Sequence, residues 1–228
     1  VSEAEAIAKQ FHRAGRTITL HGPFTDLSPG SPDRDIREVS RKRFEQLASL
    51  VPVFKPRTVV CHTGYDRKRY LPMREQWIEN SLETWDSLAA TFKREGARLM
   101  LENVYEKSPS EILPLIESLK SHNVGFCLDI GHQSAFGSVP LRQWVQSMSR
   151  HLQQLHLHDN DGQWDDHWGL GLGNINIEQL FSDLDSLKIR PLAVTLAPQG
   201  GGSQPQSRVP GTHLALVNAS FALYLKRL

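Results

Sequence analysis

The sequence predicts an α/β protein in which successive βα units surround a parallel sheet. Six short apolar segments alternate with segments of helical periodicity, and the apolar segments are nearly continuous, as in strands covered on both faces. The composition, 39% hydrophobic and 22% charged over 228 residues, is ordinary for a globular protein. We therefore expect residues 1–228 to form a single domain.

Local signals place the elements in order. A capping box from Ser2 to Glu5 opens the first helix, which Gly15 ends. Ser31-Pro32 is expected to start the second helix, which continues to about Leu50. Further helices are expected at residues 75–95, from Ser108 with a kink at Pro114, and at 140–149, 177–187 and 214–226. Strands are expected at residues 17–20, 58–61, 97–101, 124–128, 152–157 and 191–196.

Polar groups follow these strands at one end. Five of the six expected strands terminate on an imidazole or a carboxylate, always where the chain turns into a loop. The carboxyl ends of parallel strands meet at one edge, where functional sites are built. We expect one ring of oxygen and nitrogen ligands there, made of His21, His62, Glu102, Asp129 and His156.

Residues 155–175 carry the densest group of such side chains. His156 and His158 share one face of their strand because side chains alternate along it, so His156 should point to the sheet axis and His158 should support it nearer the rim. Carboxylates and imidazoles at this density favour a divalent metal among them. Asp159, Asp161 and Asp166 are expected to be turn, supporting or solvent groups.

Charge and cysteine content narrow the possible classes. A net charge of +1 lacks the basic character of nucleic-acid-binding domains, and the basic segments 34–43 and 67–74 fit solvated helix and loop faces. Cys61 and Cys127 lie in apolar strands and are expected to be buried, reduced thiols. No apolar run has the roughly 18 residues that a membrane span needs, and no signal peptide is evident. We expect a cytoplasmic protein.

Three motifs occur in order along the chain: L-E-N at 101–103, L-D-I-G-H at 128–132, and H-x-H-D-N-x-G-x-x-D-x-H with G-x-G-N-I at 156–175. With this strand placement, residues 17–198 resemble the xylose-isomerase-like TIM-barrel superfamily, which holds sugar isomerases and epimerases and endonuclease IV (AP endonuclease family 2). The resemblance implies a parallel (β/α) barrel of eight strands. Since six are evident, the first two βα units are expected to be missing at the N-terminus, by truncation or in an incomplete barrel.

The resemblance also implies a cofactor of one to three divalent ions, zinc or manganese. His21 and His62 would share one ion with bridging Glu102, and Glu102, Asp129 and His156 would bind a second. A third would lie among His132, Asp165 and His167, with His158 and Asn103 supporting the ligands.

One departure concerns the last strand, where the family has a metal-binding glutamate that takes part in proton transfer. Ala197 occupies the matching position, which leaves the central site one ligand short.

The resemblance implies a metal-dependent isomerase or epimerase of a sugar or sugar phosphate, acting by metal-assisted proton transfer next to a carbonyl. Glu102 would be the metal-linked base, and His132 is the other candidate catalytic residue. One alternative is an endonuclease IV-like zinc phosphodiesterase acting on abasic DNA, which the low net charge disfavours. Another is a metal-binding barrel that Ala197 has inactivated. A small sugar is therefore the expected partner.

Overall fold

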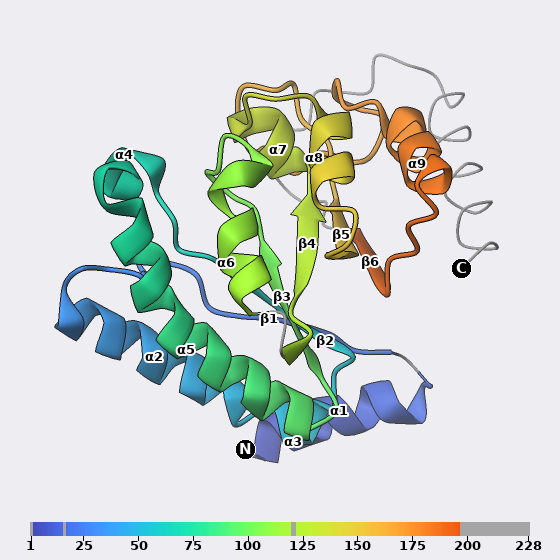
Figure 1. The fold of residues 1–228 in the computed structure, drawn as a ribbon. Helices are drawn as coiled ribbons and strands as arrows, with labels where there is room; N and C mark the ends of the chain where they lie inside the picture. Colours follow the sequence, from blue (N-terminus) through green and yellow to red (C-terminus); the bar gives the residue numbers. More distant parts are fainter. Residues whose placement is uncertain (1, 16, 120–121, 197–228) are drawn as a thin grey trace. The chain divides into compact units, whose positions relative to one another are not determined.

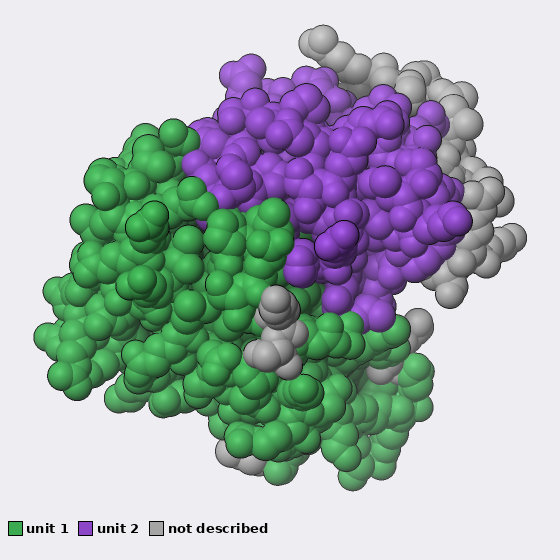
Figure 2. Space-filling view, in the orientation of Figure 1, with its two compact units in different colours: residues 1–102, 112–126 green, residues 103–111, 127–228 purple. Residues whose placement is uncertain are grey.

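The computed structural model describes residues 2–15, 17–119 and 122–196. Its strands form a six-stranded sheet whose order, β1-β2-β3-β4-β5-β6, follows the chain (Figure 1). The six predicted strands are therefore confirmed. The chain divides into two compact units, coloured separately in Figure 2: residues 1–102 with 112–126, and residues 103–111 with 127–228.

The first unit contains three parallel strands, β1 (Thr19–His21), β2 (Thr58–His62) and β3 (Arg98–Glu102). The register pairs His21 with Val60 and His62 with Glu102, so polar strand ends lie on adjacent strands. On β2 and β3, the strand residues Val59 and Leu101 are fully buried. The strands end on the predicted polar residues rather than before them, which brings these side chains into the sheet itself.

Helices pack around these strands. The longest, α5 (Arg74–Arg94), packs on β3 and buries Trp77, Trp85 and Phe92, three of the side chains that fill the core of the unit. The other helical segments of the unit are α1 (Ser2–Arg13), α2 (Arg34–Ala48), α3 (Val51–Phe54), α4 (Arg67–Tyr70), the 3-10 turn η1 (Leu71–Met73) and α6 (Leu113–Ser118). Both α2 and α6 pack against α5.

The second unit takes the end of β4 (Gly125–Asp129) together with β5 (Leu152–Leu157) and β6 (Ala193–Leu196), and β5 pairs with β6 in parallel. Up to residue 196, its described helical segments are η2 (Pro109–Glu111), α7 (Ile130–Phe136), α8 (Leu141–Ser147) and α9 (Ile177–Ser186). Helix α7 packs on β5 and α8 packs on α9, around the buried side chains of Trp144, Leu155 and Leu180.

Some predicted helix boundaries were wrong. The Ser31-Pro32 signal does not start α2; Asp33 caps it instead, with its side chain accepting a hydrogen bond of 2.8 Å from the Asp35 amide. The segment after Ser108 forms the 3-10 turn η2 and then α6, which has Pro114 in its first turn, because proline cannot donate the hydrogen bond that a continuous helix needs. The predicted helix 214–226 lies outside the described residues.

Helix α7 follows β4 directly and was not predicted, since its seven residues are too few to show periodicity. None of the helices in the described ranges is long and apolar enough to cross a membrane. Both cysteines are buried and free, as predicted.

Candidate metal centres

The strand ends of the first unit bring together His21, His62 and Glu102, called here the His–His–Glu cluster. The Nε2 atoms of His21 and His62 lie 3.0 and 3.3 Å from the same carboxylate oxygen, Oε2 of Glu102. The Glu102 carboxylate is 1% exposed, while both imidazoles reach the surface in part. This arrangement matches the ligand set that the sequence predicted for one ion.

The hydrogen bonds of His21 show what the cluster requires. Its Nδ1 donates to the Gly22 carbonyl at 2.8 Å, so in the neutral ring Nε2 carries no hydrogen. That bare nitrogen faces the Glu102 oxygen, and two acceptors at 3.0 Å repel each other unless a proton or a metal cation lies between them. The donor set therefore fits a divalent cation.

An aromatic ring closes one side of the His–His–Glu cluster. Phe24 stacks on the His62 ring with centroids 4.7 Å apart and meets the edge of the His21 ring at 5.8 Å. Cys61 directly precedes His62 on β2. Burial raises the pKa of its thiol far above the usual value, and the Glu102 charge raises that pKa further. Cys61 is thus held as a neutral thiol and supplies no thiolate ligand.

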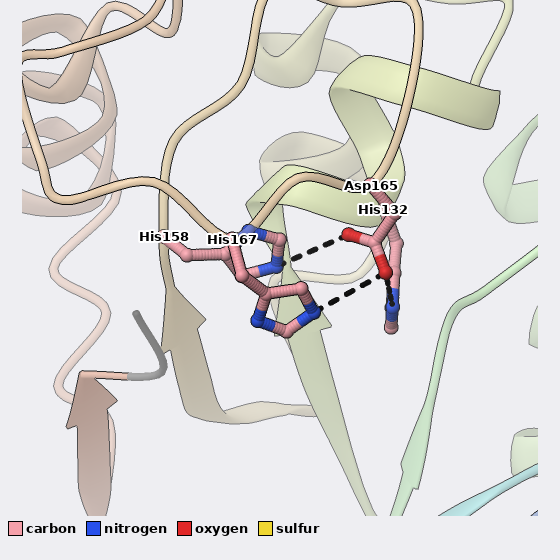
Figure 3. Close-up of side chains that lie close together, drawn as sticks. All are labelled: His132, His158, Asp165 and His167. Atoms are coloured by element: carbon pink, nitrogen blue, oxygen red, sulfur yellow. Dashed lines mark hydrogen bonds and ion pairs between the residues drawn. The ribbon is translucent and has the colours of Figure 1, made fainter. Parts of the chain in front are cut away.

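The second unit assembles His132, His158, Asp165 and His167, called here the four-residue cluster (Figure 3). Each can offer one ligand atom within 4.8 Å of the others. Asp165 is at its centre: Oδ2 lies 3.3 Å from Nε2 of His132 and 3.2 Å from Nε2 of His167, and Oδ1 lies 3.6 Å from Nε2 of His158.

Helix α7 positions His132. Oδ1 of Asp129 accepts a 2.7 Å hydrogen bond from the His132 amide, which caps the helix and fixes its first turn. The His132 ring donates from Nδ1 to the Asn103 carbonyl at 2.9 Å, so its bare Nε2 faces Asp165. Nε2 of His132 and the Asp165 oxygen are therefore two acceptors that face each other, as at His21, and a cation between them would remove the repulsion.

His158 is fully buried and belongs to the four-residue cluster, although it was predicted only to support His156. Its Nε2 lies 3.0 Å from Oδ1 of Asp129, and its ring stacks on His167 with centroids 3.8 Å apart and planes at 2°. If Nε2 donates to Asp129, Nδ1 has no hydrogen-bond partner among the described residues, and neither does Oδ1 of Asp165. Buried acceptor atoms without a hydrogen-bond partner, such as these two, are the atoms that a bound cation would satisfy.

Burial acts to raise the pKa of the Asp165 carboxyl, but the neighbouring imidazoles of His132 and His167 outweigh it and lower that pKa well below its usual value. Asp165 is therefore ionised in the neutral pH range and can act as an anionic ligand.

The loop that carries Asp165 and His167 is organised by Asp159, which was predicted to be a turn or supporting group. Its buried carboxylate accepts hydrogen bonds from the amides of Asn160, Gly171 and Ile175 at 2.9 to 3.1 Å. Its backbone pairs with Trp168 in an antiparallel bridge. These contacts hold the loop so that His167 meets Asp165.

His156 is buried in β5, with Nδ1 3.9 Å from Oδ2 of Asp129. Its Nε2 lies 3.3 Å from the side-chain amide nitrogen of Gln154, while the Gln154 Oε1 has no partner among the described residues. Rotating the amide by 180° lets Oε1 accept a hydrogen from Nε2 and leaves Nδ1 bare on the side of Asp129. Gln154 then fixes the tautomer that a ligand histidine needs.

The structure thus brings the predicted groups together in part within each unit. His21, His62 and Glu102 form one set, His132, Asp165 and His167 form another, and Asp129 and His156 lie near each other. Asn103 exchanges two 2.9 Å hydrogen bonds with the Asp129 backbone. Ala197 lies outside the described residues.

Gln154 and Phe24 were not identified from the sequence as part of these sites. Gln154 and His156 are two apart on one strand, which is the only sequence signal that could have found it. Phe24 lies in the loop after β1, and no periodicity marks such a residue.

Comparison with known proteins agrees with this picture. The family model described as xylose isomerase-like TIM barrel matches residues 1–208. An uncharacterized protein of Methanocaldococcus jannaschii is 25% identical over 177 residues, and the match covers 75% of this chain but 60% of that protein. The chain therefore spans about 60% of the length of this relative.

Two solved structures share the fold. A D-tagatose 3-epimerase-like protein aligns with a TM-score of 0.78 at 20% identity, covering 99% of this chain and 83% of that one. An L-ribulose 3-epimerase aligns with a TM-score of 0.75 at 20% identity, covering 98% of this chain and 80% of that one. The predicted TIM-barrel fold is confirmed.

Proposed function

Because this chain belongs to the xylose isomerase-like TIM-barrel family, we propose that it is a divalent-metal-dependent isomerase or epimerase of a small sugar or sugar phosphate. The observation that carries the proposal is the His–His–Glu cluster. Two imidazole nitrogens converge on one buried carboxylate oxygen, in an arrangement that a divalent cation would stabilise. Two structural neighbours support a sugar as the substrate. One is an L-ribulose 3-epimerase, and the other is a D-tagatose 3-epimerase-like protein.

The residues that would hold the metal are of the kind that zinc and manganese accept, namely neutral imidazoles and carboxylates. His21, His62 and Glu102 would hold one ion, and His132, Asp165 and His167 another. Asp129 and His156 would contribute to a central site. When bound, such an ion supplies Lewis acidity that polarises a substrate carbonyl and makes the neighbouring C–H acidic.

Glu102 would accept that proton. Its carboxylate is shielded from water, and this strengthens its electrostatic interaction with the substrate. Ala197 replaces the second carboxylate of the family, so Glu102 is the one remaining candidate base. We therefore expect Glu102 to remove the proton and return it on the same face of the substrate. This one-base route converts an aldose and a ketose into each other, whereas an epimerisation that uses both faces needs a second base.

His132 is the other candidate catalytic residue. Its Nδ1 is fixed by the Asn103 carbonyl, so only Nε2 is available for a ligand or for a substrate oxygen. This orientation is set before substrate binds, because the α7 cap at Asp129 holds the backbone of His132.

A phosphodiester hydrolase acting on abasic DNA is the second candidate. The observation in its favour is the four-residue cluster, since a separate group of ligands suits a reaction in which several ions stabilise attacking and leaving oxygens. Against it stands the net charge of +1, because duplex binding depends on phosphate neutralisation.

The test begins with metal content by mass spectrometry after purification. Zinc or manganese at one or more ions per chain is expected, and a chain that binds neither would refute both enzymatic functions. Turnover is then measured on a panel of aldoses, ketoses and their phosphates, and on an oligonucleotide with an abasic site. Interconversion of a sugar that disappears in Glu102→Gln supports the proposal, while cleavage of the oligonucleotide alone supports the second candidate.

A matched control for Glu102→Gln is Glu111→Gln, because Glu111 is a buried carboxylate of the 3-10 turn η2 that accepts a hydrogen bond from the Lys107 amide. This control should keep the metal and the activity. If both variants lose the metal and the activity equally, the Glu102→Gln result reflects a general loss of structure and not the loss of a catalytic base. A chain that retains its metal but turns over no member of the panel is the inactive barrel.

A further inference from the structure

Phe24 contacts both imidazoles of the His–His–Glu cluster. Its ring stacks on the His62 ring with centroids 4.7 Å apart and planes at 30°, and it lies edge to face with the His21 ring at 5.8 Å and 82°. The two imidazoles also meet edge to face, with centroids 5.0 Å apart. The three rings and Glu102 all belong to the first unit, so their arrangement is defined within one compact unit. Phe24 thus borders both nitrogen ligands of the proposed metal site.

The orientation of these imidazoles depends on what packs against them. The torsion that turns a histidine ring about its Cβ–Cγ bond is broad, so it does not by itself aim a nitrogen at one point. Both rings are partly open to solvent, with side chains 37% exposed in His21 and 16% exposed in His62. In the metal-free protein the bare Nε2 of His21 and the Glu102 oxygen repel each other, which favours rotation of the ring away from the cluster. Packing against a fixed neighbour opposes that rotation.

The loop that carries Phe24 is itself anchored. The Leu27 amide donates to the Phe24 carbonyl at 3.3 Å and closes a turn. The Ser28 amide then donates a 2.9 Å hydrogen bond to Oγ of Ser40 in α2, and the Ser28 hydroxyl lies 2.8 Å from the Tyr70 hydroxyl. Ser28, Ser40 and Tyr70 are buried, so these hydrogen bonds are shielded from water. The position of Phe24 is therefore set by contacts that do not involve an ion.

We propose that Phe24 is a positioning residue of the metal site, whose ring holds the imidazoles of His21 and His62 so that both Nε2 atoms converge on Glu102. This deepens the proposed function and rests on the metal site of that function. Phe24 supplies no ligand atom and acts through the two histidines. A side chain of similar volume without a planar face, such as leucine, would not reproduce the stack.

The contact also favours the ion-bound state over the ion-free state. A divalent cation on Nε2 withdraws electron density from an imidazole, and the face of an aromatic ring attracts an electron-poor partner. The stack of Phe24 on His62 is therefore stronger when the ion is bound. An interaction that is stronger in the bound state raises the affinity for the ion, in addition to any contribution to folding. Loss of the aromatic face should then lower zinc affinity even where the fold is unchanged.

The test is a chelator-buffered zinc titration of the full chain with isotope-labelled histidine rings, followed by NMR. The ring signals of His62 and His167, assigned with His62→Gln and His167→Gln, report the His–His–Glu cluster and the four-residue cluster separately. Phe24→Leu should lower zinc affinity at His62 about 3- to 10-fold, the range of one aromatic contact, and leave His167 unchanged. In the metal-free protein it should also remove the ring-current shift that the Phe24 face imposes on the His62 ring protons. Phe24→Tyr keeps the ring and should restore both readouts.

Phe11→Leu is the matched control, because Phe11 is an exposed aromatic residue of α1 outside the cluster, and it should leave zinc binding unchanged. Wild-type affinity at His62 in Phe24→Leu, or a Phe24→Tyr variant as weak as Phe24→Leu, would overturn the proposal. An equal loss of affinity at His62 and His167 would overturn it in favour of a general effect on folding. Failure of the proposed function is a separate result: zinc at His62 depends on Phe24, but no sugar of the panel is converted.

Discussion

Gly131→Ala is expected to displace His158 and so to disrupt the four-residue cluster. A Cβ at position 131 would overlap the His158 imidazole at its Cε1, Nδ1 and Nε2 atoms. The ring cannot simply move away, because it is fully buried and stacks on His167 at 3.8 Å. Substitution therefore forces either the backbone or the imidazole to shift.

The size of the effect follows from two contributions. Overpacking of a tight interior costs about 1–3 kcal/mol. Loss of the 3.0 Å hydrogen bond between His158 and Asp129 adds about 1.5–3 kcal/mol if the carboxylate is left charged. In a chain of this size 1 kcal/mol lowers the Tm by about 2–4 °C, so we expect a decrease of roughly 5–24 °C.

The assays are thermal unfolding of the metal-free protein and zinc titration in competition with a chelating dye. Zinc affinity at the four-residue cluster should fall by about 10- to 100-fold, as for other changes to groups that orient metal ligands. Gly169→Ala is the control, because a Cβ there meets only Leu172 at 3.5 Å, an ordinary contact in the same loop. If Gly131→Ala matches the wild type in both Tm and zinc affinity, the role assigned to His158 is wrong.

Three further predictions address other parts of the chain. Since burial raises the pKa of Cys61, its thiol should react with a disulfide reagent only after unfolding, and rapid labelling of native protein would contradict the burial. The pKa of Asp165 is lowered in the folded state, so its carboxylate stabilises the metal-free protein above the unfolded pKa of about 4 and this contribution is lost as pH falls. Denaturant titrations should therefore show a flatter decline in stability below pH 5 for Asp165→Asn, and identical profiles would refute the assignment. Ala197→Glu restores the carboxylate of the family and should raise sugar turnover; an unchanged rate would show that position 197 does not match the family glutamate.

The strands and the positions of their polar ends could be predicted because both depend on local sequence. An apolar run buried on both faces is readable in any window, and His62 or Glu102 at its end follows from the chain direction of a parallel sheet. The family motifs then assigned ligands to sites. The start of α2 was misplaced because two capping signals, Ser31 and Asp33, stand two residues apart, and only the geometry decides between them.

The environment of His158 could not be predicted, because it depends on contacts between residues distant in the sequence. Period-two alternation placed it on the same face as His156, and that reasoning gives no information on how deeply it is buried. Its burial depends on the small size of Gly131, which follows β4 nearly thirty positions earlier. The contacts of the Phe136 ring with the rings of Tyr105 and Trp164 also join residues distant in the sequence, so they could not be predicted either.

The backbone of His167 bears on how this protein can change over evolutionary time. Asp129 caps α7 in addition to facing His158, so selection for folding alone would keep it even in a descendant that had lost all chemistry. His167 instead has a φ of 52°, in the left-handed region, where a glycine would relieve strain of about 1–2 kcal/mol. A descendant free of functional selection would therefore gain by replacing this histidine with glycine. Its presence or replacement in related chains is a better indicator of retained activity than the presence of Asp129.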